Sequence, residues 1–527
     1  MNDLRSPEPC DPAPEPRDPA PEPRDRLFSA DGLSMDAIAR RATGGALWAM
    51  VATVIKVAVQ MGSVAIIARL VPPAEFGVVA MALPLVMIGV SLSNFGLAMA
   101  IIQRPQVTHR LANTLFWTNI ALALVICAVL LASTPLVARF YGAPKVGPVL
   151  AALSLSIFFS AALAQYYAVI RRQMRFRAAE AVTVLAEVLA AVIAVIAAWF
   201  GASYWAVVTQ QILYPALTVL GLAIATGWRP SAPPLERSMW RAARGAISFG
   251  GFITLSGMLN QVTQSLGTVI AGRVFSEAAA GAYFRGQTLS AYPEARFGNA
   301  LSGAFLPGLS RAAADGAAFR RLYMDMLRRI AFLLAPLGVL IVSGADLIVA
   351  VLLGPTWAAV GPVLAWLGLL ALGAPLTLTL GWAMTATGAV RFLAAQSVIG
   401  LLLVGSAMAL TAHLGLAAVA AAHGLTALCA LGPLSLIFAA RGTPLDIMAV
   451  CRRHGVNLAV AGATIALVMT VRGVLVFDLA LADLALVGAI IGACYLSFGL
   501  IDPALRHDAG ALMTRLKLRR SARSPDA

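Results

Sequence analysis

The sequence is poor in charge and in the residue clusters that enzymes and metal sites need. Only 12% of its 527 residues are charged, against roughly 25% in a soluble globular protein. Its five cysteines and five histidines are scattered, without disulfide, redox or metal spacing. It has no phosphate-binding P-loop and no Gly-x-Ser-x-Gly motif. We therefore expect no metal, no cofactor, no ATPase activity and no enzyme.

Long apolar runs make up most of the chain instead. Hydrophobic residues account for 60% of it, and runs of about 20 residues are each long enough to cross a ~30 Å hydrocarbon core. The short alternating segments of a β-barrel are absent. The sequence predicts an all-α polytopic membrane protein of about fourteen transmembrane helices. The expected spans are 44–68, 77–101, 112–138, 148–170, 179–200, 204–226, 246–271, 279–306, 328–351, 361–385, 391–412, 415–439, 456–472 and 479–501.

Basic residues are distributed unevenly between the loops. Loops after odd-numbered spans contain only Arg69, Arg139, Lys145, Arg273 and Arg472, whereas loops after even-numbered spans are arginine-rich. The positive-inside rule then places both termini and the even-numbered loops in the cytoplasm. The net charge of +15 follows from this topology and from contact with anionic lipids, so we expect no nucleic-acid partner.

The segments outside the spans are polar. The heptad "DPAPEPR" occurs twice, at 11–17 and 18–24, and proline at this density favours an extended chain. We expect residues 1–33 to be a disordered cytoplasmic tail without the features of a signal peptide. Residues 227–245 are expected to be a cytoplasmic linker and residues 506–527 a basic cytoplasmic tail.

An internal repeat relates the two halves of the chain. "VGPVLA" occurs at Val146–Ala151 and at Val360–Ala365, and "IARLVPPAEFG" from Ile67 corresponds to "IAGRVFSEAAAG" from Ile270. Both comparisons shift the chain by six spans, an even number, so the halves have the same orientation. The repeat predicts two pseudo-symmetric six-helix bundles followed by two additional helices. Their expected limits are 34–226, 246–440 and 441–505.

The eighth span is the least apolar. It carries Arg285, Glu294 and Arg296, each of which costs roughly 3 kcal/mol if it faces lipid. At 100° per residue Arg285 and Arg296 share one helical face. With polar stripes on the first, second and seventh spans, they predict a central cavity rich in cations, which favours a phosphate-containing anion. The predicted cavity residues are Lys56, Gln60, Asn94, Asn260, Gln264, Arg285, Tyr292, Arg296 and Asn299.

The charges also allow other interpretations. They can pair with one another or reach an interface by snorkelling. Two carboxylates are candidates for coupling transport to a proton or a sodium ion, Glu187 on the fifth span and Glu294 on the eighth. The arginines near Glu294 stabilise its ionised form, which favours Glu187 as the coupling group.

The stretch "IARLVPPAEFGVVAMALPLVMIGVSLSNFGLAMAIIQRPQVTHRLANTLFWTN", with "RRQMRF", "GAFLPGLSR" and "LGPTWAAVGPVLAWL" further on, resembles bacterial polysaccharide-export proteins of the Wzx/PST type. These belong to the multidrug/oligosaccharidyl-lipid/polysaccharide (MOP) exporter superfamily. The resemblance implies a flippase that moves an undecaprenyl-pyrophosphate-linked oligosaccharide across the inner membrane, for exopolysaccharide, capsule or O-antigen assembly. It also implies a polysaccharide polymerase and export machinery as partners, and it supplies no fixed set of site residues.

Two alternatives remain at this point. A cation-coupled multidrug extruder of the same superfamily would be expected to have a carboxylate in its first span, where this chain has Lys56. A polymerase or ligase of the same pathway would need a large periplasmic loop, and the longest non-cytoplasmic connections here have about ten residues.

Overall fold

The computed structural model describes residues 35–93, 108–232, 255–475, 479–503 and 506, and the regular structure in these ranges is helical. Long helices are expected because a backbone in lipid must satisfy its hydrogen bonds within its own segment. Twelve of the described helices are long and apolar enough to cross a membrane. The predicted all-α polytopic membrane architecture is therefore confirmed.

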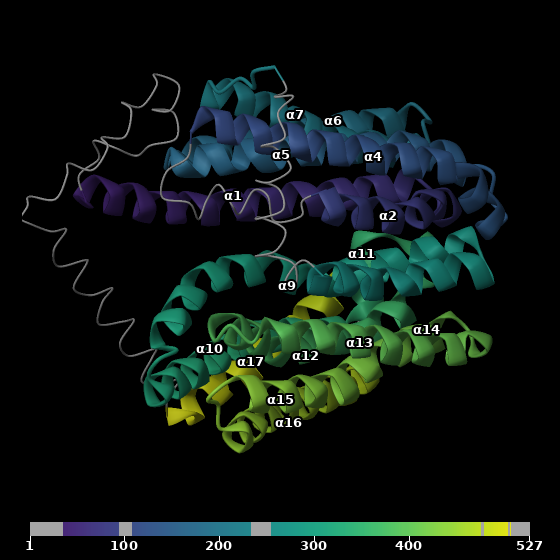
Figure 1. Cartoon of the computed structure of the whole chain (residues 1–527). Coiled ribbons are helices and arrows are strands. Elements are labelled where there is room, and N and C mark those ends of the chain that lie inside the picture. The colour runs from purple at the N-terminus through teal and green to yellow at the C-terminus, as the bar shows by residue number, and fades with distance from the viewer. Residues whose placement is uncertain (1–34, 94–107, 233–254, 476–478, 504–505, 507–527) are drawn as a thin grey trace, which may run out of the picture.

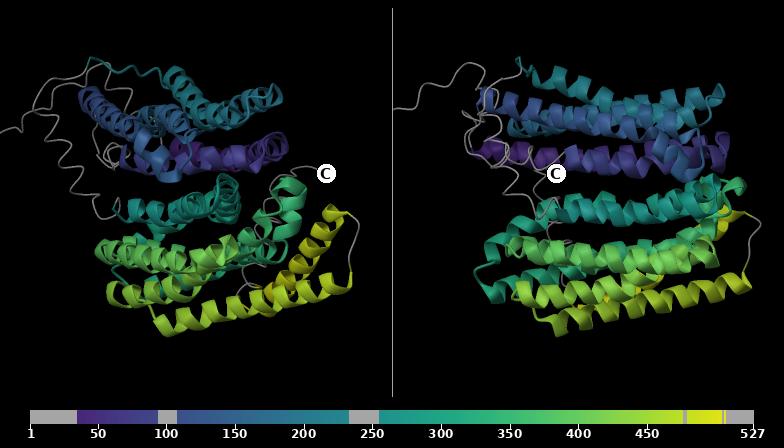
Figure 2. Two further views of the ribbon diagram at one scale, coloured as in Figure 1. Left: turned by 90° about the vertical axis from the view of Figure 1, so that its right-hand side faces the viewer. Right: turned by 45° about the vertical axis from the view of Figure 1, so that its right-hand side comes forward.

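The helices form two groups that lie side by side (Figures 1 and 2). The first group, which we call the first lobe, includes α1 (Met35–Leu70), α2 (Pro73–Ser93), α4 (His109–Tyr141), α5 (Val146–Arg172), α6 (Phe176–Trp199) and α7 (Tyr204–Thr226).

The second lobe contains the remaining described helices. It starts with helical residues 255–270 and continues with η2 (Ala271–Phe275), α9 (Glu277–Ala312), α10 (Gly316–Ser343), α11 (Ala345–Leu352), η3 (Pro355–Trp357), α12 (Val360–Ala386), α13 (Val390–Thr411), η4 (Ala412–Leu414), α14 (Leu416–Thr426), η5 (Ala427–Leu431), α15 (Gly432–Gly442), α16 (Ile447–Val474) and α17 (Ala480–Ile501). Figure 1 shows α9 beginning beside the first lobe and bending away from it. Two prolines, Pro293 and Pro307, lie within this helix.

Two expected spans are helical but lie outside the twelve apolar ones. Helix α9 corresponds to the eighth expected span, and its charged residues lower its hydropathy. The seventh corresponds to residues 255–275, which directly follow a part of the chain outside the described residues. The ninth expected span, 328–351, is divided in the structure. Helix α10 starts earlier, because Asp315 accepts hydrogen bonds from the first backbone N–H groups, and it ends before Gly344.

The repeated hexapeptide has the same structural position in both lobes. "VGPVLA" opens α5 in the first lobe and α12 in the second, and both helices are 27 residues long. Each copy follows a turn that contains a glycine with positive φ, 66° at Gly142 and 91° at Gly354. Glycine adopts this conformation without the steric cost that other residues incur.

The second repeated motif forms the tightest contact between the lobes. Helices α2 and α9 start at the same end of the molecule and pack against each other. A Cβ atom added to Gly77 would lie 1.8 Å from the carbonyl oxygen of Glu277, and one added to Gly281 would lie 2.6 Å from that of Pro73. Each glycine thus faces the residue four positions before the other glycine, which is a pseudo-twofold arrangement. We call this end of the molecule, defined by Gly77 and Gly281, the closed end.

Other contacts join the lobes at the closed end. Trp357 Nε1 donates to the carbonyl of Ala68 at 2.8 Å. Arg69 donates to the carbonyls of Val351 at 2.9 Å and Leu352 at 3.3 Å. A single hydrophobic cluster extends from α2 and α5 into η3 and α12. The lobes therefore share one hydrophobic core at this end.

In the main contacts between helices, the last two helices pack only against elements of the second lobe. Helix α16 packs against α10, and α17 packs against α10 and α11. An ion pair joins Arg472 of α16 to Asp346 of α11, and a second joins Arg453 to Asp502 just after α17. The second lobe is consequently wider than the first.

The glycine contact makes a testable prediction about the closed end. Replacing Gly77 or Gly281 by alanine should separate the lobes there, because the opposing atoms are backbone and cannot move aside alone. Overpacking of this kind costs roughly 1–3 kcal/mol. The distance between spin labels at Ala74 and Thr356, which are exposed residues of different lobes, should increase in pulsed EPR measurements on a cysteine-free background.

Gly62→Ala is the matched control. Gly62 is also within a helix, α1, but a Cβ atom there would have no neighbour within 4 Å. This variant should keep the wild-type distance. A wild-type distance in Gly77→Ala as well would contradict the tight backbone contact.

Candidate functional site

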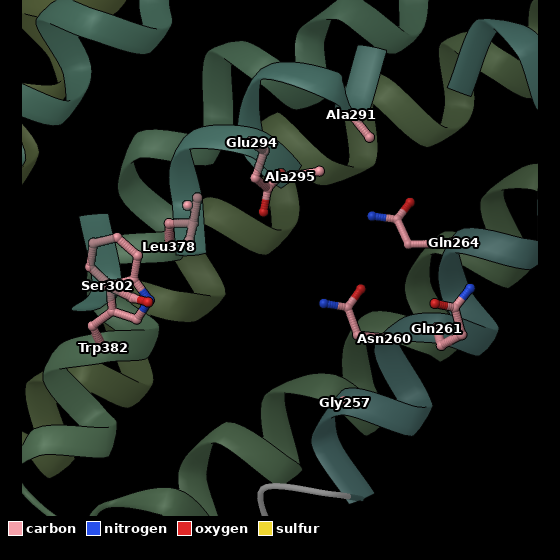
Figure 3. Close-up of a pocket in the computed structure, with 11 residues that line it drawn as sticks. Gly257, Asn260, Gln261, Gln264, Ala291, Glu294, Ala295, Ser302, Leu378 and Trp382 are labelled. Carbon is pink, nitrogen blue, oxygen red and sulfur yellow. The ribbon is translucent and has the colours of Figure 1, made fainter. Parts of the chain in front are cut away.

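A polar cavity of about 360 Å³ lies between helical residues 255–270, α9 and α12. Figure 3 shows Asn260 and Gln264 pointing from their helix toward the side of the cavity where Glu294 lies. The residues that line it are Gly257, Asn260, Gln261, Gln264, Ala291, Glu294, Ala295, Gly298, Ser302, Leu378 and Trp382. Three carboxamides, one carboxylate and one indole can together bind a ligand rich in hydroxyl groups.

A second cavity of about 150 Å³ shares Asn260, Gln264 and Glu294 with the first. It extends toward α13, where Gln396 and Ser397 line it. Gln287, which lines neither cavity, orients the Gln264 amide, because Gln287 Nε2 donates to Gln264 Oε1 at 2.9 Å. The polar surface therefore continues from the first cavity into the interior of the second lobe.

The larger cavity adjoins the boundary between the lobes. Gln261, which lines it, donates to Met87 Sδ of α2 at 3.7 Å. Tyr292, next to the lining residue Ala291, donates its hydroxyl hydrogen to Gln60 Oε1 of α1 at 3.1 Å. A movement of one lobe against the other would therefore change the access to this cavity.

Glu294 is the charged member of the cavity lining. It makes no hydrogen bond or ion pair with the residues that the structure describes. None of the described residues therefore competes with a ligand hydroxyl, a cation or a proton for this carboxylate. Glu187, the other coupling candidate, lies half-buried on α6 of the first lobe and already takes part in an interaction within the protein.

Lys56 lies in the first lobe and is paired. Its Nζ is 2.8 Å from Glu180 Oε2 and 3.5 Å from Thr183 Oγ1, both on α6. The Lys56 side chain is 16% exposed and that of Glu180 is 27% exposed. The polar stripe of α1 thus contacts three helices, because Lys56 meets α6, Ser63 accepts a hydrogen bond from Gln210 of α7, and Gln60 meets α9.

Arg285 lies near the closed end, away from the residues that line the cavity. It is 8% exposed, and its guanidinium carbon is 3.9 Å from the centre of the Phe76 ring. It shares with Tyr292 the side of α9 that meets the first lobe. The structure therefore places the predicted site residues in four main locations. Asn260, Gln264 and Glu294 line the cavity, Lys56 forms the ion pair in the first lobe, Gln60 and Tyr292 bond each other across the lobe boundary, and Arg285 lies at the closed end. Glu187 lies apart from these, on α6.

Three predicted residues cannot be assigned to these locations. Asn94 lies outside the described residues. Arg296 and Asn299 belong to α9, but their side chains are likewise outside what the structure describes.

The sequence analysis missed several lining residues, namely Gln261, Ser302, Trp382, Gln396 and Ser397. Trp382, Gln396 and Ser397 lie in the tenth and eleventh expected spans, outside the predicted polar stripes. Polar residues at membrane depth in those spans were the signal that could have identified them. Across the described ranges, no group of three or more His, Cys, Asp or Glu residues could hold a metal ion.

Comparison of the sequence with known proteins identifies the family of this chain. Residues 66–362 match the family described as "Polysaccharide biosynthesis protein". The chain is 23% identical over 330 residues to the lipopolysaccharide biosynthesis protein WzxC of Escherichia coli, a match covering 62% of this chain and 66% of the relative. It is 29% identical over 311 residues to the succinoglycan biosynthesis transport protein ExoT of Rhizobium meliloti, covering 59% of this chain and 61% of that one. The matches thus span less than two thirds of the length of these relatives.

Solved structures share the fold. The lipid II flippase MurJ in an inward closed conformation aligns with a TM-score of 0.62 at 12% identity, covering 86% of this chain and 98% of that one. An inward-facing multidrug resistance MATE transporter of the MOP superfamily aligns with a TM-score of 0.53 at 14% identity, covering 81% and 98%. At such identities the likeness concerns the fold alone.

The family match covers more than half of the chain and includes the closed end and all of α9. It confirms the resemblance to polysaccharide-export proteins. The chain belongs to the polysaccharide biosynthesis protein family and is a multi-pass membrane protein with a MurJ- and MATE-like fold.

Proposed function

We propose that the chain is a flippase for undecaprenyl-pyrophosphate-linked oligosaccharides and works by alternating access between its two lobes. The observation that carries the proposal is the cavity around Asn260, Gln264 and Glu294, which adjoins the lobe boundary of a polysaccharide transporter. Carboxamides and a carboxylate can hydrogen-bond sugar hydroxyls, and the Trp382 indole offers an apolar ring for the face of a sugar. The lipid tail would stay in the bilayer while the headgroup crosses between the lobes.

The division of the chain is part of this proposal. The two moving bodies would be residues 34–226 and 246–440, joined by the linker 227–245, with 441–505 carried by the second body. In a bacterial inner membrane with both termini in the cytoplasm, the closed end would face the periplasm. The structure would then correspond to a state in which the periplasmic side is shut.

The predicted site residues take different parts in this cycle. Arg296, Asn299 and Asn94 remain candidates for contact with the substrate. Lys56 would contact the diphosphate only after it leaves Glu180, so its ion pair would be exchanged during transport. The polymerase and the export machinery that consume the oligosaccharide outside are expected partners.

Glu294 is the better candidate for coupling to a proton or a sodium ion. Its lack of a partner among the described residues and its position in the cavity support this role, which reverses the preference for Glu187 drawn from sequence. The same feature would serve a cation-coupled drug extruder, the alternative function. The relatives named for polysaccharide biosynthesis favour the flippase.

The proposed orientation can be tested by labelling cysteines in intact cells. Cysteines that replace Lys145 and Thr356 should react with an impermeant reagent, whereas cysteines that replace Arg177 and Ala314 should not. All four positions are exposed in the structure, so all four should react in permeabilised cells. Labelling of Arg177→Cys or Ala314→Cys from outside intact cells would overturn the orientation.

The role of Lys56 can be separated from its ion pair. Lys56→Ala should lower polysaccharide export at an unchanged amount of protein in the membrane, because a charged hydrogen bond to phosphate contributes about 1.5–3 kcal/mol. Lys56→Ala combined with Glu180→Gln removes the unpaired carboxylate that the single change leaves behind. If Lys56 binds substrate, the double variant should export as poorly as the single one. Recovery of export in the double variant would make Lys56 a structural charge.

The coupling role can be tested with reconstituted protein. Flux of a fluorescent lipid-linked oligosaccharide should increase under an imposed proton or sodium gradient, and Glu294→Gln should reduce it to the flux without a gradient. Glu187→Gln, the matched change in the first lobe, should keep the response. An intact gradient response in Glu294→Gln would exclude Glu294 as the coupling group, and failure of Asn260→Ala to reduce flux would argue against the cavity as the substrate site.

A further inference from the structure

Arg285 is a buried cation within the contact between the lobes. Its guanidinium carbon lies 3.9 Å from the ring centre of Phe76 in the first lobe and 6.0 Å from that of Trp357 in the second. The residue is 8% exposed. It therefore lies between aromatic side chains of both lobes while the closed end is shut.

The guanidinium has no anionic partner there. Arg285 makes no hydrogen bond or ion pair with the described part of the chain, and its buried Nε has no acceptor. Buried charges in proteins are normally paired, and stacking on an aromatic ring replaces only part of the lost hydration. The closed end thus buries the Nε–H donor of this arginine without an acceptor from these residues.

Arg285 differs in this respect from Arg69, the other described arginine that bridges the lobes at the closed end. Arg69 also bridges the lobes at the closed end, but it donates to the backbone carbonyls of Val351 and Leu352. The same local environment therefore supplies acceptors to one arginine and none to the other.

We propose that Arg285 is a cryptic binding site for a diphosphate, hidden while the closed end is shut and exposed when the lobes separate there. The planar guanidinium fork matches two phosphate oxygens. The stacking aromatic side chains leave no acceptor beside it in the shut state, so a diphosphate binds the open state more tightly. A ligand with such a preference shifts the equilibrium toward opening.

This inference rests on the proposed function and adds a step to it. Arg285 precedes Glu294 by nine residues on α9, or about 13 Å at 1.5 Å per residue. A headgroup whose sugars occupy the cavity therefore has its diphosphate within one helix segment of Arg285. Arrival of the diphosphate at Arg285 opens the closed end, so that release follows loading.

The test measures the open-to-closed ratio with spin labels at Ala74 and Thr356 in phosphatidylcholine nanodiscs. Inorganic diphosphate should raise the ratio in the wild type by roughly tenfold, equivalent to about 1.4 kcal/mol. Arg285→Gln should abolish this response. The response to diphosphate is the readout, because loss of the charge alters both stacking and hydration in the resting protein.

Arg69→Gln is the matched control. It removes an arginine that bridges the same two lobes, so the resting ratio should rise, but the response to diphosphate should persist. Arg285→Lys keeps the charge without the planar fork and should respond at higher diphosphate concentration. A wild type that does not respond, or an Arg285→Gln variant that responds as the wild type does, would overturn the proposal.

Two further arms separate the ligand source and the proposed function. Undecaprenyl diphosphate in the nanodisc should act as inorganic diphosphate does, whereas an equal response to phosphatidylglycerol would assign the site to ordinary lipid phosphate and overturn the diphosphate assignment. Flux of lipid-linked oligosaccharide is measured separately. A protein that opens with diphosphate but moves no such lipid refutes the flippase and keeps the site; one that moves the lipid without this opening refutes the site alone.

Discussion

The close approach of two backbones, Gly77 on α2 and Gly281 on α9, is the contact on which the arrangement of the lobes depends. Each glycine meets the backbone of the other helix four residues before the partner glycine, so one pseudo-twofold contact positions both lobes at once. Backbone atoms cannot adjust by rotamer changes as side chains do. Trp357, Arg69 and Arg285 surround this contact, and in the proposed cycle their contacts between the lobes would break together with it.

Charged side chains within the expected spans are found in three kinds of environment. Lys56 is paired with Glu180, Arg285 is stacked on Phe76, and Glu294 lies in a polar cavity. A structural charge is normally neutralised by a neighbour, as Lys56 is. The two that are not neutralised by described residues, Arg285 and Glu294, lie on the same helix. Helix α9 therefore carries both the arginine proposed to bind the diphosphate and the carboxylate proposed to bind the coupling ion.

Much of the fold was predictable because it follows from composition. Apolar runs depend on the bilayer rather than on tertiary detail, and the hexapeptide of α5 and α12 revealed the repeat. The division of the ninth span at Gly344 and the partners of each charge were not predictable. Lys56 and Glu180 are 124 residues apart in sequence, and only packing of α1 against α6 brings them together. Helical periodicity placed Arg285 and Tyr292 on one face, but it could not show that this face meets Phe76 and Gln60.

The attachment of α16 and α17 to the second lobe has a consequence for the surrounding lipid. The two lobes are related by a pseudo-twofold axis at the closed end, but their perimeters differ, because the ion pairs of Arg472 and Arg453 fix two more helices to one side only. In the proposed alternating-access cycle, a rotation of the lobes about that axis would displace more lipid around the second lobe than around the first. The bilayer would then resist the two halves unequally, and the narrower first lobe would move more freely against the membrane.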